Sequence, residues 1–165
     1  MPGEIFISNE HESVVTTVGA GVAVCLRDIE KGIGGMCNFL IPHFSVQSDL
    51  SWSKKIGNYM LATMIDSIVE LGGSNKYLEG QLLGGDQAKL ENLKHGKASL
   101  TFVKAYMKKN NIRLKNEYIG GHHARKVYFK PQNGIIEMKK LSSRDIEVYD
   151  IEKQCVEKIK KIKYN

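Results

Sequence analysis

Long hydrophobic runs are missing from this sequence. No stretch approaches the roughly 18 to 20 consecutive apolar residues that a membrane-spanning helix needs. Met1 to Glu4 carry no basic segment followed by an apolar run, as a secretory signal would. We therefore expect a cytoplasmic protein without membrane insertion.

Cysteine is scarce and forms no recognisable disulfide or metal pattern. The chain has three cysteines, an odd number, at spacings that match no common zinc motif. Without a secretory signal they are best interpreted as reduced thiols, and Cys25 and Cys155 lie in apolar patterns typical of buried positions. The neighbours His122 and His123 would face opposite sides of an extended segment, which favours a surface turn over a shared metal. We predict neither a metal nor a cofactor.

The excess of positive charge is concentrated at one end of the chain. The 165 residues are 42% hydrophobic and 25% charged, which is typical of one globular domain, and the formal net charge is +6. From Lys153 onward there are five lysines against one glutamate, Glu157. This distribution indicates a solvated helix face more than a nucleic-acid groove, which would also need interleaved aromatic side chains. We therefore expect no nucleic-acid partner, and a basic nucleic-acid-binding module is kept only as a third hypothesis.

The first forty residues favour short strands. β-branched side chains and glycine are frequent in four segments: 5–7, 14–18, 22–26 and 34–41. Within residues 22–26 the even-numbered side chains would face one way, and Ala23 and Cys25 the other. Because both faces are apolar, we expect this strand to be covered on both sides.

Helices and hairpins follow these strands. Apolar residues at three- and four-residue spacing predict a helix from a cap at Ser51 or Ser53 to Leu71. Further helices are predicted over 98–109 and along an apolar stripe from Val148 to Ile162, and further strands over 76–83, 112–119, 125–130 and 135–140. The dipeptide Asn133-Gly134 predicts a tight hairpin between the last two strands. Because strands and helices do not alternate, the predicted fold class is α+β.

Glycine-containing elements recur along the chain in an order that resembles one known family. Four segments carry the resemblance: the apolar strand at 22–28, the Gly-Gly-Met element at 34–42, Leu-Gly-Gly at 83–85 and the Gly-Gly…Arg-Lys-Val element at 118–127. In order and spacing they are similar to the CheD family of chemoreceptor glutamine deamidases, from about Ser13 to Lys140. The resemblance implies layered β-sheets flanked by helices, related to cysteine-hydrolase-type deamidases. We expect a CheD-like domain over 1–142, and a basic helical extension of the same domain over 143–165.

The resemblance also implies a reaction, the hydrolysis of a glutamine side-chain amide on chemoreceptor helices to glutamate. In the family a cysteine thiolate attacks the amide carbon, a histidine activates the thiol and protonates the departing ammonia, and a threonine orients the imidazole. The cysteine lies at a tight glycine turn, where backbone N–H groups could stabilise the oxyanion.

The nucleophile position of the family is not a cysteine in this chain. Alignment on residues 22–26 puts Gly21 at the cysteine position and Val15 at the threonine position. Alignment on residues 17–21 instead puts Ala23 at the cysteine position. Neither register supplies a thiol.

The base position is also changed. Asn38 stands where the family has its histidine, and the seventeen residues from Gly21 to Asn38 equal the family's spacing between nucleophile and base. A carboxamide cannot take a proton from a thiol at neutral pH, and glycine offers no nucleophile. We therefore expect deamidation to be absent or very weak.

Other residues offer a weaker route to catalysis. Cys37 with His43 is the best remaining pair, and Cys25 is a further fallback nucleophile. Adjacent strand residues face opposite sides, so Cys37 should point away from the pocket that Asn38 faces. This alternative hypothesis is a deamidase that uses a rearranged cysteine.

The leading hypothesis is a binding regulator in chemotaxis. If the catalytic groups are lost and the glycine framework is kept, the surface that reads a receptor helix can still bind helices. The predicted binding residues are Gly19, Gly21, Asn38, Gly84, Gly85 and Gly120, whose glycines allow positive φ and close backbone approach, although structural turns would explain them equally well. The implied partners are the cytoplasmic helices of chemoreceptors and a CheC- or CheX-type phosphatase that acts on phosphorylated CheY.

Overall fold

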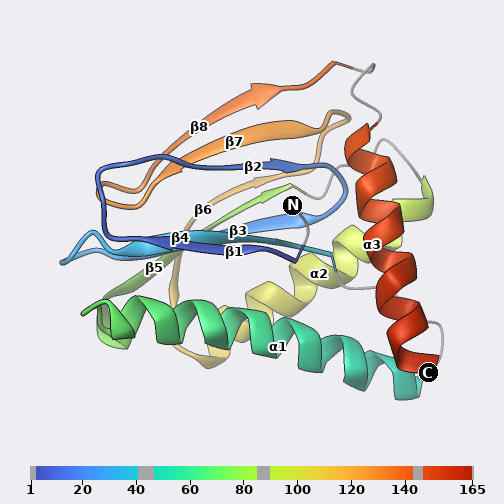
Figure 1. The fold of residues 1–165 in the computed structure, drawn as a ribbon, viewed down its shortest axis with the longest axis horizontal. Helices are drawn as coiled ribbons and strands as arrows, with labels where there is room; N and C mark the ends of the chain where they lie inside the picture. The colour runs from blue at the N-terminus through green and yellow to red at the C-terminus, as the bar shows by residue number, and fades with distance from the viewer. Residues whose placement is uncertain (1–2, 41–46, 85–89, 143–146, 165) are drawn as a thin grey trace.

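The described part of the chain forms two β-sheets and three α-helices. The computed structural model describes residues 3–40, 47–84, 90–142 and 147–164 (Figure 1). The first sheet has five strands, in the order β1 (Ile5–Ser8), β4 (Gly34–Phe39), β3 (Val22–Asp28), β5 (Leu78–Gly84) and β6 (Arg113–Ile119). Only the β5–β6 pair is parallel among these strand pairings. The second sheet is antiparallel and has the order β2 (Val14–Val18), β7 (Arg125–Lys130) and β8 (Ile135–Lys140).

The helices complete the layers. α1 (Gln47–Glu70) and α2 (Leu90–Lys109) cover the face of the five-stranded sheet that is turned away from the second sheet (Figure 1). A 3₁₀ helix, η1 (Asn75–Tyr77), leads into β5. α3 (Glu147–Tyr164) runs across one end of the layers (Figure 1). Strands and helices do not alternate regularly along the chain. The predicted α+β class is therefore correct. None of the described helices is both long and apolar enough to cross a membrane.

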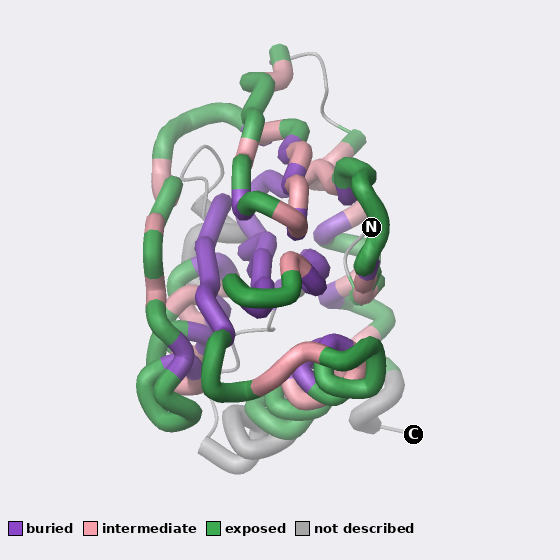
Figure 2. The backbone as a smooth tube through the Cα atoms, turned by 90° about the vertical axis from the view of Figure 1, so that its left-hand side faces the viewer, coloured by how far each residue is buried: buried purple, intermediate pink, exposed green. Residues whose placement is uncertain are grey.

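Two apolar cores lie on either side of β3. Val22, Val24 and Leu26 pack toward α1 and α2, whereas Ala23 and Cys25 pack toward the second sheet. Figure 2 shows the resulting buried segments in the middle of the molecule and the exposed ones around them. The strand is covered on both faces, as its sequence pattern predicts.

The ends of several elements follow local signals. Gly72, with φ of 100°, and Asn111, with φ of 55°, follow α1 and α2 in the left-handed conformation that is common after a helix. Gly134 also has a positive φ, of 73°, and its N–H donates to Lys130 O across the β7–β8 turn at 2.8 Å. The Asn-Gly hairpin is therefore confirmed.

The helix starts differ from those predicted. α1 begins at Gln47, before either proposed cap, Ser51 or Ser53, and α2 begins at Leu90 rather than at residue 98. The first turn of α1 is mostly polar, and the leucines that open α2, Leu90 and Leu93, are separated from the predicted stripe by His95-Gly96-Lys97. The apolar pattern used for the prediction therefore begins later than either helix. β5 begins at Leu78, because residues 75–77 form η1 instead of a strand.

Candidate functional site

The glycine turn between β2 and β3 binds a carboxylate from the far end of the chain. The backbone N–H groups of Gly19 and Gly21 donate to Glu152 Oε1 at 2.9 and 3.0 Å. The N–H group of Ala20 donates to Glu152 Oε2 at 2.9 Å. All four residues are buried. Three successive N–H groups that converge on one anion form a backbone nest, which is a favourable environment for negative charge.

Gly19 is needed here for space. A Cβ atom at this position would lie 2.9 Å from both Glu152 Oε2 and Tyr149 Cε1. The φ angle of Gly19 lies outside the left-handed region, so of the two properties expected of these glycines, close backbone approach is the one used at this residue. The reason for glycine at position 19 is the close approach of α3.

Gly84 and Gly120 lie at the same end of the five-stranded sheet. Gly84 has φ of 115°, and a Cβ atom there would lie 2.3 Å from Gly21 O. Gly120 has φ of 81°, and its N–H donates to Gly84 O at 3.0 Å. Positive φ is therefore confirmed at these two glycines. The predicted site residue Gly85 lies outside the described residues.

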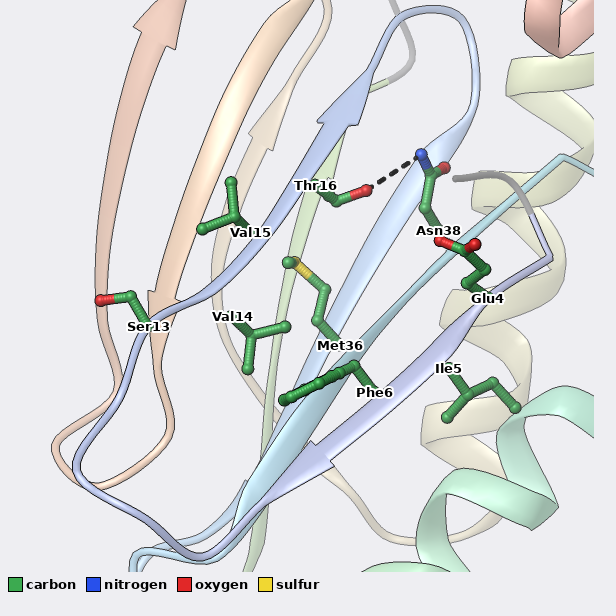
Figure 3. A pocket seen from close by; sticks show the side chains of 9 residues that line it. All are labelled: Glu4, Ile5, Phe6, Ser13, Val14, Val15, Thr16, Met36 and Asn38. Atoms are coloured by element: carbon green, nitrogen blue, oxygen red, sulfur yellow. Dashed lines mark hydrogen bonds between the residues drawn. The ribbon is translucent and has the colours of Figure 1, made fainter.

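Asn38 lies in the layer between the two sheets. It is 2% exposed, and its Nδ2 donates to Thr17 O at 2.7 Å and to Thr16 Oγ1 at 3.5 Å (Figure 3). Its Oδ1 is buried and has no hydrogen-bond partner among the residues that the structure describes. The uncharged side chain thus links β4 to β2 by hydrogen bonds, and it contains no group that can act as a base.

A pocket of about 460 Å³ adjoins Asn38 (Figure 3). Glu4, Phe6, Thr16 and Met36 contribute to its wall. Gly21 is not among the residues that line this pocket, and its N–H group donates to Glu152 Oε1. Gly21 and Asn38, the positions that the register on residues 22–26 matches to the family's nucleophile and base, therefore do not share this pocket.

The alignment on residues 22–26 puts Val15 at the family's threonine position, but the hydroxyl that bonds to Asn38 belongs to its neighbour. Val15 is 46% exposed and is one of the residues that line the pocket. The neighbouring Thr16 supplies the hydroxyl beside Asn38 instead. Adjacent residues of β2 face opposite sides of the sheet, so a shift of one position in the alignment exchanges Val15 for Thr16 beside Asn38.

The fallback thiols are poorly suited to nucleophilic attack. Cys37 packs in the core beneath α1 and α2, away from Asn38, as predicted. Burial raises the pKa of Cys37 to about 12, and burial followed by the nearby Cys37 raises that of Cys25. Both remain protonated at neutral pH, and a thiol is far less nucleophilic than its thiolate. His43, the proposed partner of Cys37, lies outside the described residues.

The histidine pair lies in the turn between β6 and β7, where His122 and His123 are both exposed. The Arg125 guanidinium donates to the carbonyl groups of Tyr118 and Gly120 and so ties this turn to the end of β6. Within the described residues, no cluster of three or more His, Cys, Asp or Glu side chains could hold a metal ion.

Glu152 is the site residue that sequence reasoning missed. The predicted stripe of α3 contains Ile151, Cys155 and Ile159, yet the buried residues of this helix, where burial is described, are Glu152 and Val156. A signal was present, because Tyr149, Glu152 and Val156 follow a three- and four-residue spacing of their own. A carboxylate on that line marks a position that needs a partner, because charge is rarely buried unpaired.

Comparisons with known proteins identify the class of protein. Residues 40–140 match the family model described as CheD chemotactic sensory transduction, which places the chain among chemotaxis proteins. Three bacterial proteins, each named "Probable chemoreceptor glutamine deamidase CheD", are 32% identical to it. The protein from Hahella chejuensis aligns over 87% of this chain and 69% of its own length. Those from Halorhodospira halophila and a Janthinobacterium species align over 86% of this chain and over 68% and 71% of their own lengths.

The chain belongs to the CheD family. Both the family model and the relatives agree with the resemblance carried by the four glycine-containing elements. Within this family the residues that the chain offers at the glycine turn are backbone N–H groups and a carboxylate from α3. The arrangement can bind an anion, and it holds no thiol at either expected nucleophile position.

Proposed function

We propose that this CheD-family protein acts mainly by binding helices of its chemotaxis partners, not by deamidating them. The single observation that carries the proposal is the occupant of the glycine turn. Gly21, at the position of the family's nucleophile, has no side chain, and its N–H donates to a carboxylate that is presented by a helix. The turn thus retains the capacity to hold a helix-borne polar side chain and lacks the group that would attack it.

The state of the thiols supports binding over catalysis. Cys25 and Cys37 are buried and have raised pKa values, and Cys37 faces the helical layer instead of the glycine turn. A rearranged deamidase would require one of them to leave its core and lose a proton. Both steps are costly, because a buried thiolate loses its solvation.

The proposed partners are the cytoplasmic helices of chemoreceptors and a CheC- or CheX-type phosphatase. The relatives are named for chemoreceptor glutamine deamidation, which supports a receptor as the first partner to test. The proposal places the chain in the cytoplasm with those helices. Binding to a phosphatase would let the protein tune the lifetime of phosphorylated CheY.

A binding assay with both purified partners tests the proposal. The receptor cytoplasmic domain and the phosphatase are each immobilised, and the protein is applied up to about 50 µM, where a weak regulatory contact would still register. We expect saturable binding to at least one of them. Absence of binding to both would end the proposal.

The same incubation separates binding from catalysis. Mass spectrometry of the receptor would show a gain of about one dalton for each glutamine hydrolysed to glutamate. We expect no gain above that of the receptor alone. A gain that disappears in a Cys37→Ser or Cys25→Ser variant would establish the deamidase alternative instead.

A further inference from the structure

One carboxylate closes the glycine turn from more than 130 positions away in the sequence. Glu152 accepts three hydrogen bonds of 2.9 to 3.0 Å from Gly19, Ala20 and Gly21, and its exposed fraction is 0%. Removing a charge from water costs several kcal/mol unless strong hydrogen bonds replace the lost solvation. The three N–H groups supply that replacement, so the turn and the carboxylate fit each other chemically.

The turn is selective for a carboxylate over a carboxamide. It presents three backbone N–H donors to Glu152. A carboxylate has lone pairs for all three, whereas the NH₂ group of a glutamine side chain would face a donor. Hydrogen bonds to an ionised acceptor are also about twice as strong as those between neutral groups. A helix carrying glutamate should therefore bind here more tightly than the same helix carrying glutamine.

α3 resembles a bound ligand more than a core element. Only Glu152 and Val156 are buried among its residues of described burial, and Tyr149 packs against Gly19. Among the described side chains, those of α3 contribute to neither of the two apolar cores around β3. Lys153, Lys158 and other charged residues cover its outer face. An amphipathic helix held by a few anchors is a common form of peptide ligand.

We propose that the amides of Gly19, Ala20 and Gly21 form a binding site for a helix-borne glutamate, and that α3 occupies this site as an intramolecular ligand. The inference rests on the proposed function, because a partner helix that uses the turn must first displace α3. A tethered ligand acts at an effective concentration in the millimolar range. A partner helix of equal intrinsic affinity, present at micromolar concentration, would be excluded about a thousandfold. α3 therefore acts as a built-in competitor.

The test uses the full chain, two variants and a peptide probe. Glu152→Gln removes the charge that the turn binds, and Glu157→Gln is the matched control on the exposed face of the same helix. The probe is a fluorescent peptide with the sequence of residues 147–164. A second probe is the same peptide carrying Glu152→Gln. Circular dichroism verifies that each chain is folded.

We expect the Glu152→Gln chain to bind the first probe at least tenfold more tightly than the unmodified chain and the Glu157→Gln chain do. The second probe should bind at least tenfold more weakly than the first. Adding Gly19→Ala to the Glu152→Gln chain should weaken binding of the first probe about 5- to 150-fold, because the new Cβ would lie 2.9 Å from the position of the carboxylate oxygen. Equal affinity of the probe for all chains, or equal affinity of the two probes, would overturn the inference.

Hydrogen exchange of the unmodified chain gives a second test that needs no variant. The amides of residues 19–21 bond to Glu152, so they should exchange only when α3 leaves, with the same protection as the α3 amides. Much faster exchange at residues 19–21 than in α3 would contradict the inference. These tests can succeed even if the proposed function fails. If both tests succeed, and neither the unmodified chain nor the Glu152→Gln chain binds a receptor or phosphatase, α3 is an intramolecular ligand but the proposed partners are wrong.

Discussion

Gly19→Ala adds one methyl group at the contact between the β2–β3 turn and α3. The new Cβ would lie 2.9 Å from Glu152 Oε2 and from Tyr149 Cε1, well inside the 3.5–4.0 Å at which carbon atoms pack best. Both contacted atoms belong to α3. The strain is therefore relieved by an outward movement of the helix, which breaks the hydrogen bonds to Glu152.

The structure sets both the size and the direction of this effect. Overpacking of one methyl group costs about 1–3 kcal/mol, which raises the population of undocked α3 about 5- to 150-fold. The backbone at Gly19 is outside the left-handed region, so alanine is not strained there and reduces the entropy of the unfolded chain by about 0.4–1 kcal/mol. We therefore expect α3 to loosen while the sheets keep or slightly increase their stability.

Two measurements check the Gly19→Ala prediction. Hydrogen exchange in α3 should accelerate about 5- to 150-fold, with little change in β3 and β5. Labelling of Cys155 should accelerate as well, because burial, its largest perturbation, raises the pKa of this thiol and undocking removes that burial. Cys25 and Cys37 are fully buried and should stay unlabelled in the folded chain.

A double-mutant cycle supplies the control. In a Glu152→Ala background α3 is already released, so Gly19→Ala should have no further effect on α3 exchange. The reasoning is refuted if α3 exchanges at the unmodified rate in Gly19→Ala, or if β3 loosens while α3 does not.

Three further predictions concern the sheets. Gly84→Ala puts a Cβ on a residue with φ of 115°, at 2.3 Å from Gly21 O. The free energy of unfolding should fall by about 3 kcal/mol, and the Tm measured by calorimetry by about 6–12 °C. An unchanged Tm would show that the contact relaxes freely. Cys37 has a folded pKa of about 12 against an ordinary 9.0, so its thiol stabilises the fold fully below pH 9, and urea titrations should lose about 1.4 kcal/mol per pH unit between pH 9 and 12. The slope should be shallower in Cys37→Ala, and an identical slope would exclude this thiol. Asn38→Asp puts a buried carboxylate against Thr17 O. The free energy of unfolding should fall by about 3 kcal/mol at pH 8, and by less at pH 4, where a protonated carboxyl can donate to Thr17 O. A loss of stability that does not depend on pH would argue against ionisation as the cause.

Local patterns predicted much of the fold. The alternation within residues 22–26 correctly assigned side chains to two cores, and Asn133-Gly134 correctly marked the β7–β8 hairpin. These signals depend on the geometry of a few neighbouring residues, so they survive in any tertiary context. The helix starts at Gln47 and Leu90 were missed, because the first turn of α1 is mostly polar and the segment His95-Gly96-Lys97 interrupts the apolar pattern of α2.

The pocket beside Asn38 was only partly predictable. Strand alternation correctly separated Cys37 from Asn38. The sequence could not show that Thr16 would reach Asn38, because that contact joins β2 of one sheet to β4 of the other. How two sheets pack face to face depends on their twist and on the side chains between them, not on either strand alone.

By itself, the sequence determined the strands, the two-sided apolar character of β3 and the absence of a thiol at either nucleophile register. Only the tertiary structure decided that the amides of residues 19–21 bind Glu152, a partner 131 to 133 positions away. The physical reason is that a backbone N–H group carries no sequence signature. Its direction is set by the turn, and its partner is set by where a distant helix comes to rest.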